Sequence, residues 1–275
     1  MKRVGILYHP MLSAAGPLAQ ELAARLEALS VAAWVCSAWE EEEARNQVAG
    51  SDLLLSIGGD GTILRAARIA VPWPVPILGV NMGRLGFMTE LSAAEVRQRL
   101  PDIVSGMGWL DERAMLEVEL SPGEEHRRVF HALNDAVVGR GALARTVELQ
   151  VRVDGETVSS YKADGIILAT ATGSTGYSLA AGGPILYPQS REIMVQPLLA
   201  HLVANTALVL SPSAKVEVEI RSSSQASLSI DGQIDLPLKD GDLIQAAASL
   251  YQTRFLRLQP PGYFYRTLAQ RLSGR

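Results

Sequence analysis

Cysteine is nearly absent from this chain of 275 residues, because Cys36 is the only one. One cysteine cannot form an intrachain disulfide, and this usage is typical of a reducing compartment, so we expect a cytoplasmic protein. A long apolar run is also missing, since no stretch approaches the roughly 18 uncharged apolar residues that suggest a membrane span. The basic start of the chain reaches His9-Pro10 after a short apolar run, which predicts a first strand and no signal peptide.

Excess positive charge is lacking as well. The chain carries 25 Lys and Arg against 29 Asp and Glu, a net charge of −4. Binding to nucleic acid depends on clustered positive charge, so we expect no nucleic-acid partner. The four histidines are scattered, and no spacing of His and Cys typical of a metal site is present.

Hydrophobic residues make up 48% of the chain, and its length favours one large domain or two smaller ones. The first hundred residues alternate strand and helix patterns, which predicts a Rossmann-like α/β domain with a parallel sheet. Ser92 followed by Glu95 is typical of a capping box at a helix start. The predicted strands cover residues 4–8, 31–36, 53–57 and 75–80, and the predicted helices cover residues 18–29, 40–48, 63–69 and 92–104.

The pattern changes near residues 105–112 to an alternation with a period of two, broken by turns such as Asp154-Gly155. This predicts an all-β second domain, a β-sandwich. Its expected strands cover residues 115–120, 129–138, 147–153, 166–169, 216–220, 228–230, 243–248 and 255–258. A helical tail over 263–271 is expected to pack back onto the first domain. The predicted domains are therefore 1–106 with 259–275, and 107–258.

The most informative stretch is Gly58-Gly59-Asp60-Gly61-Thr62, which separates a buried strand from a helix. Glycines let backbone N–H groups approach an anion, and the helix start adds the positive end of its dipole. Asp60 can take a proton or contact a metal ion. A plain tight turn is the alternative, but the carboxyl end of a central strand favours a phosphate site. Neither a Walker A loop nor a G-x-G-x-x-G fingerprint is present.

A second cluster, residues 170–186, interrupts the strand pattern with hydroxyls and glycines. It suits a ligand with hydroxyls, amides and phosphates, and the alternative is a long surface connection. Asn134-Asp135 interrupts an apolar run, and a buried polar group left unpaired there costs about 1–3 kcal/mol. Lys162 and Asp164 either pair with each other at the surface or contact a ligand. Asp231-Gly232-Gln233 alone is typical of a hairpin turn.

In this order the pieces resemble one family, the NAD kinases, which use ATP or polyphosphate. The resemblance spans nearly the whole chain. Its Thr-Gly-Ser-Thr-x-Tyr-Ser loop with Gly-Gly-Pro is specific, whereas Gly-Gly-Asp-Gly is shared with lipid kinases and is similar to phosphofructokinase. The matching residues are 58–62, 81–87, 134–135, 164–165, 172–178, 181–184 and 231–233.

The resemblance implies transfer of a phosphoryl group from ATP to the 2′-hydroxyl of the adenosine ribose of NAD, giving NADP. It also implies a divalent cation, Mg²⁺ or Mn²⁺, and a homodimer or homotetramer. Asp60 is then the catalytic base, because a carboxylate within reach of a hydroxyl helps to remove its proton. Mg²⁺ binds largely through phosphates and water, so no dedicated protein cage is expected, with Asp60 as a candidate ligand.

The resemblance also implies a set of binding residues. For NAD they are Asp60, Gly61, Asn134, Asp135, Arg145, Lys162, Asp164, Thr175, Gly176, Tyr177, Ser178, Leu179, Ala180 and Gln233. For the phosphates of ATP they are Gly58, Gly59, Gly61, Thr62 and Arg65.

The chain departs from the family pattern around His201, where Pro, Ser and Arg common in the family are replaced. Gly176 stands where Ala is common. Two other functions compete with the NAD kinase hypothesis. A lipid or sphingoid kinase shares the glycine turn, but residues 170–186 are too polar to favour it. A module that binds NAD(H) without turnover is disfavoured because the chain retains Asp60.

Overall fold

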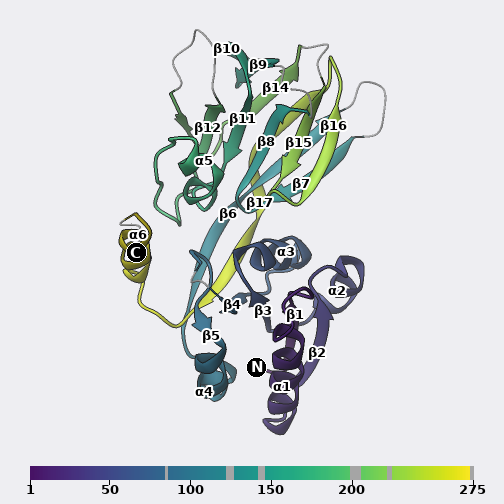
Figure 1. Cartoon of the computed structure of the whole chain (residues 1–275), viewed down its shortest axis with the longest axis vertical. Helices are drawn as coiled ribbons and strands as arrows, with labels where there is room; N and C mark the ends of the chain where they lie inside the picture. Colours follow the sequence, from purple (N-terminus) through teal and green to yellow (C-terminus); the bar gives the residue numbers. More distant parts are fainter. Residues whose placement is uncertain (84–85, 122–126, 142–145, 199–205, 222–224, 273–275) are drawn as a thin grey trace. The chain divides into compact units, whose positions relative to one another are not determined.

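The computed structural model describes residues 1–83, 86–121, 127–141, 146–198, 206–221 and 225–272 (Figure 1). The chain divides into two compact units, Met1–Glu112 with Thr253–Arg275 (unit 1) and Arg113–Gln252 (unit 2). Strands β6 (Trp109–Ser121) and β17 (Leu243–Arg257) each cross this division. The boundaries expected at 106/107 and 258/259 lie just outside these strands, whereas the units divide within them.

Unit 1 has the alternating order that its sequence predicts. Its helices are α1 (Ala15–Ala28), α2 (Glu41–Val48), α3 (Asp60–Ala70), α4 (Ala93–Val104) and the terminal α6 (Tyr263–Leu272). Its strands are β1 (Arg3–Tyr8), β2 (Ala32–Ser37), β3 (Leu53–Gly58), β4 (Ile77–Asn81) and the short β5 (Leu91–Ser92), with the end of β17. The capping box of α4 is present, with Ser92 and Glu95 each accepting the other's backbone N–H.

The sheet of unit 1 is parallel, in the order β2-β1-β3-β4, with Phe255 of β17 beside Ile77 of β4. Every residue of β3 is buried, as expected of a strand covered on both faces. Helix α1 contacts α4, and α2 contacts α3. Because these strands are parallel, the carboxyl ends of β1, β2 and β3 lie at one edge of the sheet, where open α/β folds bind their ligands.

Unit 2 is almost entirely β. Its strands are β7 (Arg128–Ala132), β8 (Asp135–Arg140), β9 (Val147–Val153), β10 (Glu156–Ala163), β11 (Gly165–Ala169), β12 (Ile193–Leu198), β13 (Leu208–Leu210), β14 (Val216–Ile220), β15 (Ala226–Ile230) and β16 (Ile234–Leu238), with most of β6 and β17. The short helices η1 (Gly173–Thr175) and α5 (Tyr177–Ala180) interrupt them.

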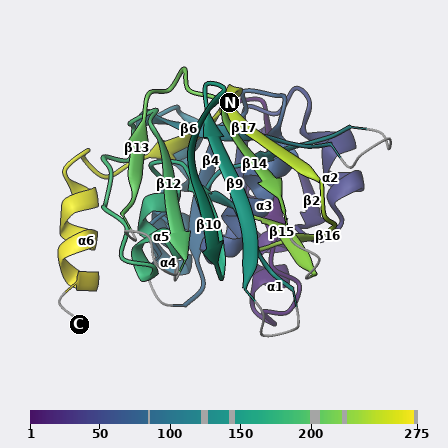
Figure 2. The ribbon, with the colours of Figure 1, turned by 90° about the horizontal axis from the view of Figure 1, so that it is seen from above.

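Two antiparallel sheets make up unit 2. One runs β13-β12-β11-β8-β15-β16, and the other pairs β10, β9, β14 and β17, with β6 joining β17 to β7. Strands β9 and β10 lie side by side in both views (Figure 2) and are joined at Asp154-Gly155, both with positive φ. Such a pair is typical of a type I′ hairpin. Inward-facing residues of both sheets form one core, which includes Val138, Leu149 and Val218.

Three expected strands differ in extent from those observed. The run 129–138 is two strands, β7 and β8, separated at Leu133 and Asn134. The run 243–248 and residues 255–257 of the run 255–258 belong to the continuous strand β17. None of the described helices combines the length and the apolar character needed to span a membrane.

Candidate functional site

Asp60 is the first residue of α3 and follows the glycine turn at the end of β3. Its Oδ2 accepts a hydrogen bond from the backbone N–H of Phe87 at 2.8 Å, and its Oδ1 accepts one from Met88 at 3.1 Å. Gly86 packs so closely that a Cβ there would overlap the carboxylate. Asp60 is thus held in one orientation by the segment 86–88, and each oxygen keeps a second lone pair for a ligand.

Thr62, two residues further along α3, has a buried hydroxyl. The residue is 1% exposed, and Oγ1 makes no hydrogen bond to any described residue. This oxygen lies against Gly58, where a side chain would overlap it. A buried hydroxyl without a partner is costly, so it marks a place where a ligand or a water completes the turn.

In unit 2 the carboxylate of Asp231 organises the segment between β7 and β8. It accepts the backbone N–H of Leu133 at 3.0 Å, of Asn134 at 2.7 Å and of Asp135 at 3.1 Å. Asp231 and Gly232 both adopt positive φ, 52° and 62°, at the turn between β15 and β16. The expected hairpin turn therefore also fixes the backbone that carries Asn134 and Asp135.

The hydroxyl-rich loop contacts the same segment. Thr170 N–H donates to the carbonyl of Asn134 at 2.9 Å, and its hydroxyl donates to the carbonyl of Leu133 at 2.6 Å. Gly173 lies so close to the carbonyl of Asn134 that a side chain there would clash. A methyl group at Gly176 would lie 3.7 Å from Asn134 Nδ2 and 4.0 Å from Asp135 Oδ2.

Asn134 and Asp135 both carry buried polar groups that a ligand would satisfy. Asn134 Oδ1 is buried and has no hydrogen-bond partner among the described residues. Asp135 is 5% exposed. Burial, and secondarily the nearby charge of Asp231, raises the pKa of Asp135 to about 7. This carboxyl can therefore exchange a proton near neutral pH and can either donate or accept a hydrogen bond.

Other residues expected to bind NAD have partners elsewhere in unit 2. Lys162 Nζ pairs with Glu148 at 3.2 Å, and Asp164 Oδ1 lies 3.7 Å from Arg140 Nε. Each of the two residues is therefore paired with a different neighbour, and the alternative of a Lys162–Asp164 pair does not describe these contacts. Lys162 also lines a pocket of about 220 Å³, formed by Glu148, Leu149, Gln150, Ser160, Lys162 and Arg221.

The remaining predicted residues vary in exposure. In α5, Tyr177 is 50% exposed, whereas Ser178 is buried with its hydroxyl 3.6 Å from Met194 Sδ. Leu179 and Ala180 complete this helix, and Gln233 follows the Asp231 turn. Arg145 and His201 lie outside the described residues. Sequence reasoning did not find that Phe87 and Met88 hold Asp60, because both act through their backbone N–H groups.

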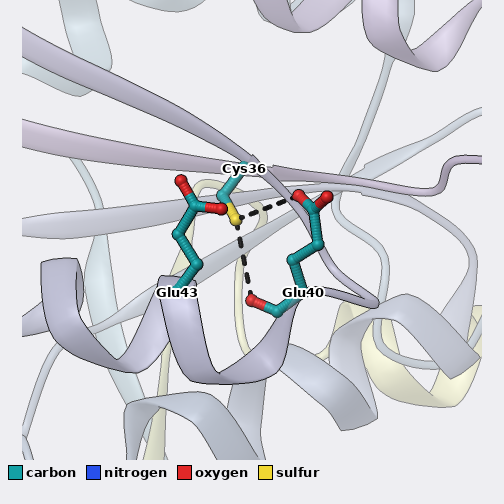
Figure 3. A group of neighbouring side chains, drawn as sticks. All are labelled: Cys36, Glu40 and Glu43. Carbon is teal, nitrogen blue, oxygen red and sulfur yellow. Dashed lines mark hydrogen bonds between the residues drawn. The ribbon is translucent and has the colours of Figure 1, made fainter.

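A group of metal-ligating types lies elsewhere in unit 1. Cys36, Glu40 and Glu43 lie close together (Figure 3), the one such trio among the described residues. Burial first, then Glu43 and Glu40, raises the pKa of Cys36 to about 11. Its thiol donates to the carbonyl and carboxylate of Glu40, each at 3.7 Å. A metal ion would have to displace the proton of this thiol in order to bind the trio.

Unit 1 is an α/β unit whose glycine turn carries the carboxylate of Asp60, and unit 2 is a β-sandwich with a polar loop. This combination is typical of an enzyme that handles nucleotides. Two family profiles match the chain: the ATP-NAD kinase N-terminal domain over residues 7–107 and the ATP-NAD kinase C-terminal domain over residues 133–258. The chain belongs to the NAD kinase family. It is an enzyme that phosphorylates NAD with ATP as the donor. The family and the fold class predicted from the sequence are therefore confirmed.

Relatives and solved structures agree with this family. The chain is 43% identical over 274 residues to an NAD kinase of Dehalococcoides mccartyi, covering 99% of this chain and 96% of that one. It is 39% identical over 272 residues to an NAD kinase of Chloroflexus aurantiacus, covering 99% of both. Yeast NADH kinase complexed with NADH superposes with a TM-score of 0.88 at 26% identity, covering 99% of this chain and 88% of that chain. An NAD kinase of Archaeoglobus fulgidus in complex with ATP gives 0.76 at 26% identity, covering 98% of both.

Proposed function

We propose that the acceptor is the 2′-hydroxyl of the adenosine ribose of NAD and that Asp60 removes its proton. A ribose hydroxyl is a poor nucleophile at neutral pH, so a positioned carboxylate lowers the barrier to its attack. The observation that carries this proposal is the pair of N–H groups, from Phe87 and Met88, that fixes both oxygens of Asp60. A base with a fixed orientation keeps its remaining lone pairs ready for the hydroxyl.

The phosphates of ATP are assigned to the turn 58–62 and to Arg65. The support is the helix start of α3, the closely packed Gly58 and the buried hydroxyl of Thr62, which has no partner among the described residues. Phosphoryl transfer needs mainly positioning and stabilisation of negative charge, which these groups supply. Arg65 adds a positive charge in the second turn of the same helix.

A divalent cation, Mg²⁺ or Mn²⁺, fits this turn. Asp60 offers carboxylate oxygens, the ligands that Mg²⁺ prefers, and Mg²⁺ keeps waters and phosphate oxygens in its remaining positions. When bound, the cation neutralises charge on the phosphates of the donor. The carboxylate of Asp60 is the protein group that would hold it, since each of its oxygens accepts one backbone N–H and keeps a lone pair.

NAD is assigned to unit 2 through Asn134, Asp135 and the loop at Thr175 and Gly176. The buried acceptor of Asn134 and the raised pKa of Asp135 support this assignment, because both gain from hydrogen bonds to a polar ligand. The proposed NAD set also includes Asp60, Gly61, Tyr177, Ser178, Leu179, Ala180, Lys162, Asp164, Gln233 and Arg145. A homodimer or homotetramer and a cytoplasmic location are also proposed. Sedimentation equilibrium tests the oligomer.

The test incubates the purified chain with Mg²⁺, ATP and NAD and measures NADP with an NADP-specific dehydrogenase. We expect NADP to form, and chelation of the cation to stop its formation. Asp60→Asn should lower the rate by at least about a hundredfold, the scale of lost acid–base help, while NAD binding stays within a few-fold. Unchanged turnover in this variant removes Asp60 from the mechanism.

A further inference from the structure

Three side chains stack beyond the carboxyl ends of β1 and β2. The rings of His9 and Trp39 lie 4.5 Å apart between centroids, inclined by 59°. The guanidinium carbon of Arg65 lies 4.2 Å from the centroid of the Trp39 ring. Trp39 nevertheless remains 43% exposed, so part of this residue is accessible to a ligand.

This stack is continuous with the turn assigned to the phosphates. His9 N–H donates to the carbonyl of Ile57 at 2.9 Å, at the end of β3. Its Cβ lies 3.2 Å from the place where a Cβ of Gly58 would be, beside the hydroxyl of Thr62. All of these residues belong to unit 1, at the edge of the parallel sheet where ligands bind.

The guanidinium group of Arg65 could bind a phosphate. The neighbouring carboxylate, Glu41, is taken by Arg68 at 2.8 Å and by Arg45 at 3.0 Å. Burial, followed by the charge of Arg68, lowers the pKa of Arg65, although an arginine stays charged in proteins. An anion placed beside Arg65 would offset both effects, and the α3 start already favours one there.

Two further apolar side chains are exposed on the segment after His9. Met11 and Leu12, which follow His9, are 80% and 39% exposed. Exposed apolar and aromatic groups next to a cation match a flat heterocycle that carries a charged tail. Inorganic phosphate chains have the tail and lack the heterocycle.

We propose that Trp39 is the platform on which the base of the donor nucleoside triphosphate stacks, with His9 beside it and Arg65 directed to the phosphates. This inference rests on the proposed function and adds to it a residue that contacts the base of the donor. A platform for a base favours a nucleoside triphosphate over inorganic polyphosphate as donor. Base stacking on an aromatic ring tolerates different bases, so GTP should share the site.

The test compares Trp39→Ala and Trp39→Phe with wild type, using the KM for Mg-ATP and the inhibition constant of inorganic triphosphate against ATP. Trp73→Ala is the matched control. Trp73 is 47% exposed and lies in the same unit, between α3 and β4 and therefore at the amino end of that strand. Inorganic triphosphate probes the phosphate contacts without a base.

Trp39→Ala should raise the KM for ATP by about 5- to 150-fold, the range of base stacking. The inhibition constant of triphosphate should stay within about twofold of wild type, since no stacking is lost. Trp39→Phe should restore most of the affinity for ATP, and Trp73→Ala should change neither constant.

An unchanged KM for ATP in Trp39→Ala overturns the proposed platform. An equal rise in the KM for ATP and in the inhibition constant of triphosphate also overturns it, because that result indicates a displaced loop. A chain that forms no NADP from ATP and NAD contradicts the proposed function instead. Equilibrium dialysis with radiolabelled ATP then decides the platform by itself, because wild type should bind ATP more tightly than Trp39→Ala. Equal binding overturns it.

Discussion

Gly86 sets the position of Asp60 at the scale of one residue. A methyl group at Gly86 would overlap the carboxylate that Phe87 and Met88 hold. Gly86→Ala therefore retains Asp60, the proposed base, but displaces its carboxylate. Because small misplacements of a reacting group cost up to about a hundredfold, kcat should fall by between about ten- and a hundredfold. Steady-state kinetics, with a check that the variant is folded, measure this change.

The same loop provides the control for this variant. Gly83 is exposed, and a Cβ there would meet nothing within 4 Å. Gly83→Ala should retain wild-type kcat. If both variants lose activity alike, the loop as a whole is sensitive to substitution, and the contact between Gly86 and Asp60 has no special part.

Asp135 predicts a pH dependence of stability. Its pKa is about 7 in the folded chain against a model-peptide value of 3.8. Between these values the unfolded chain loses the proton while the folded chain keeps it, so ionisation favours unfolding as pH rises. The stabilising effect of this group is fully present below about pH 4 and is lost as pH rises through 7. Each unit of difference in pKa corresponds to about 1.4 kcal/mol.

Asp135→Asn removes this ionisation. The free energy of unfolding of the variant, relative to wild type, should therefore rise between about pH 4 and pH 7 and then level off. Urea denaturation at several pH values measures it. Asp235→Asn, at an exposed position on β16, is the matched control for replacing a carboxylate by an amide. A flat profile for Asp135→Asn would contradict the raised pKa.

The sequence indicates chemistry at residues whose side chains carry it, and less elsewhere. Asp60 could be singled out because an acid between glycines, directly after a buried strand, lies where α/β sheets bind their ligands. Asp231 could not, because Asp-Gly is also an ordinary hairpin turn and its three N–H partners are distant in sequence. The N–H groups of Phe87 and Met88 leave no side-chain signal at all.

At the scale of elements, one buried ion cluster joins β6, β17 and the segment after β4. Arg257 donates to Asp111 at 3.1 Å, to Glu90 at 3.1 Å and to the carbonyl of Met88 at 2.8 Å. All three charged side chains are less than a tenth exposed. Arg257→Met leaves two buried carboxylates without their cation, so stability should fall by about 3–5 kcal/mol. Chemical denaturation measures the loss.

The same two strands offer a matched control. Arg254 pairs with Glu112 at 3.1 Å, but these side chains are 35% and 48% exposed. Water screens such a pair, so Arg254→Met should cost less than about 1 kcal/mol. Similar losses in the two variants would mean that burial does not set the cost at this junction.

Strand limits follow from contacts that the local pattern does not reveal. The run 129–138 is interrupted because Asp231 takes the N–H groups of residues 133–135. Strand β10 occupies the edge of its sheet, where polar residues are normal, so its sequence gives little alternation. The sequence does not predict strand β12 either, and its Pro197 argues against a strand. In the structure, Pro197 pairs with Ile166 of β11. It lies beyond residue 195, the last residue of β12 that pairs with β13.

At the scale of the molecule, the change from helical to alternating periodicity predicts the two parts of the fold. The sequence pattern divides the long strand β17 because the environment of this strand changes along its length. Ile244 and Ala246 are buried with more exposed neighbours, as in an antiparallel sheet, whereas 255–257 are buried without a break. A strand shared by two kinds of sheet follows neither periodicity throughout, so its continuity is visible only in three dimensions.

The proposed assignment gives NAD most of its contacts in unit 2, besides Asp60 and Gly61, and gives the phosphates of ATP their contacts in unit 1, and hydrogen–deuterium exchange can separate the two sets. ATP alone should slow exchange at residues 57–65 in unit 1, and NAD alone at residues 133–136 and 170–178 in unit 2. A ligand at a hundred times its Kd stabilises the folded state by about 2.7 kcal/mol, enough to slow amides that exchange by opening of its site. NAD that protects 57–65 and leaves 133–136 unchanged would contradict the assignment of Asn134 and Asp135. Protection by NAD in Asp60→Asn should match wild type, because this residue is assigned to proton removal and most of the affinity for NAD is assigned to unit 2.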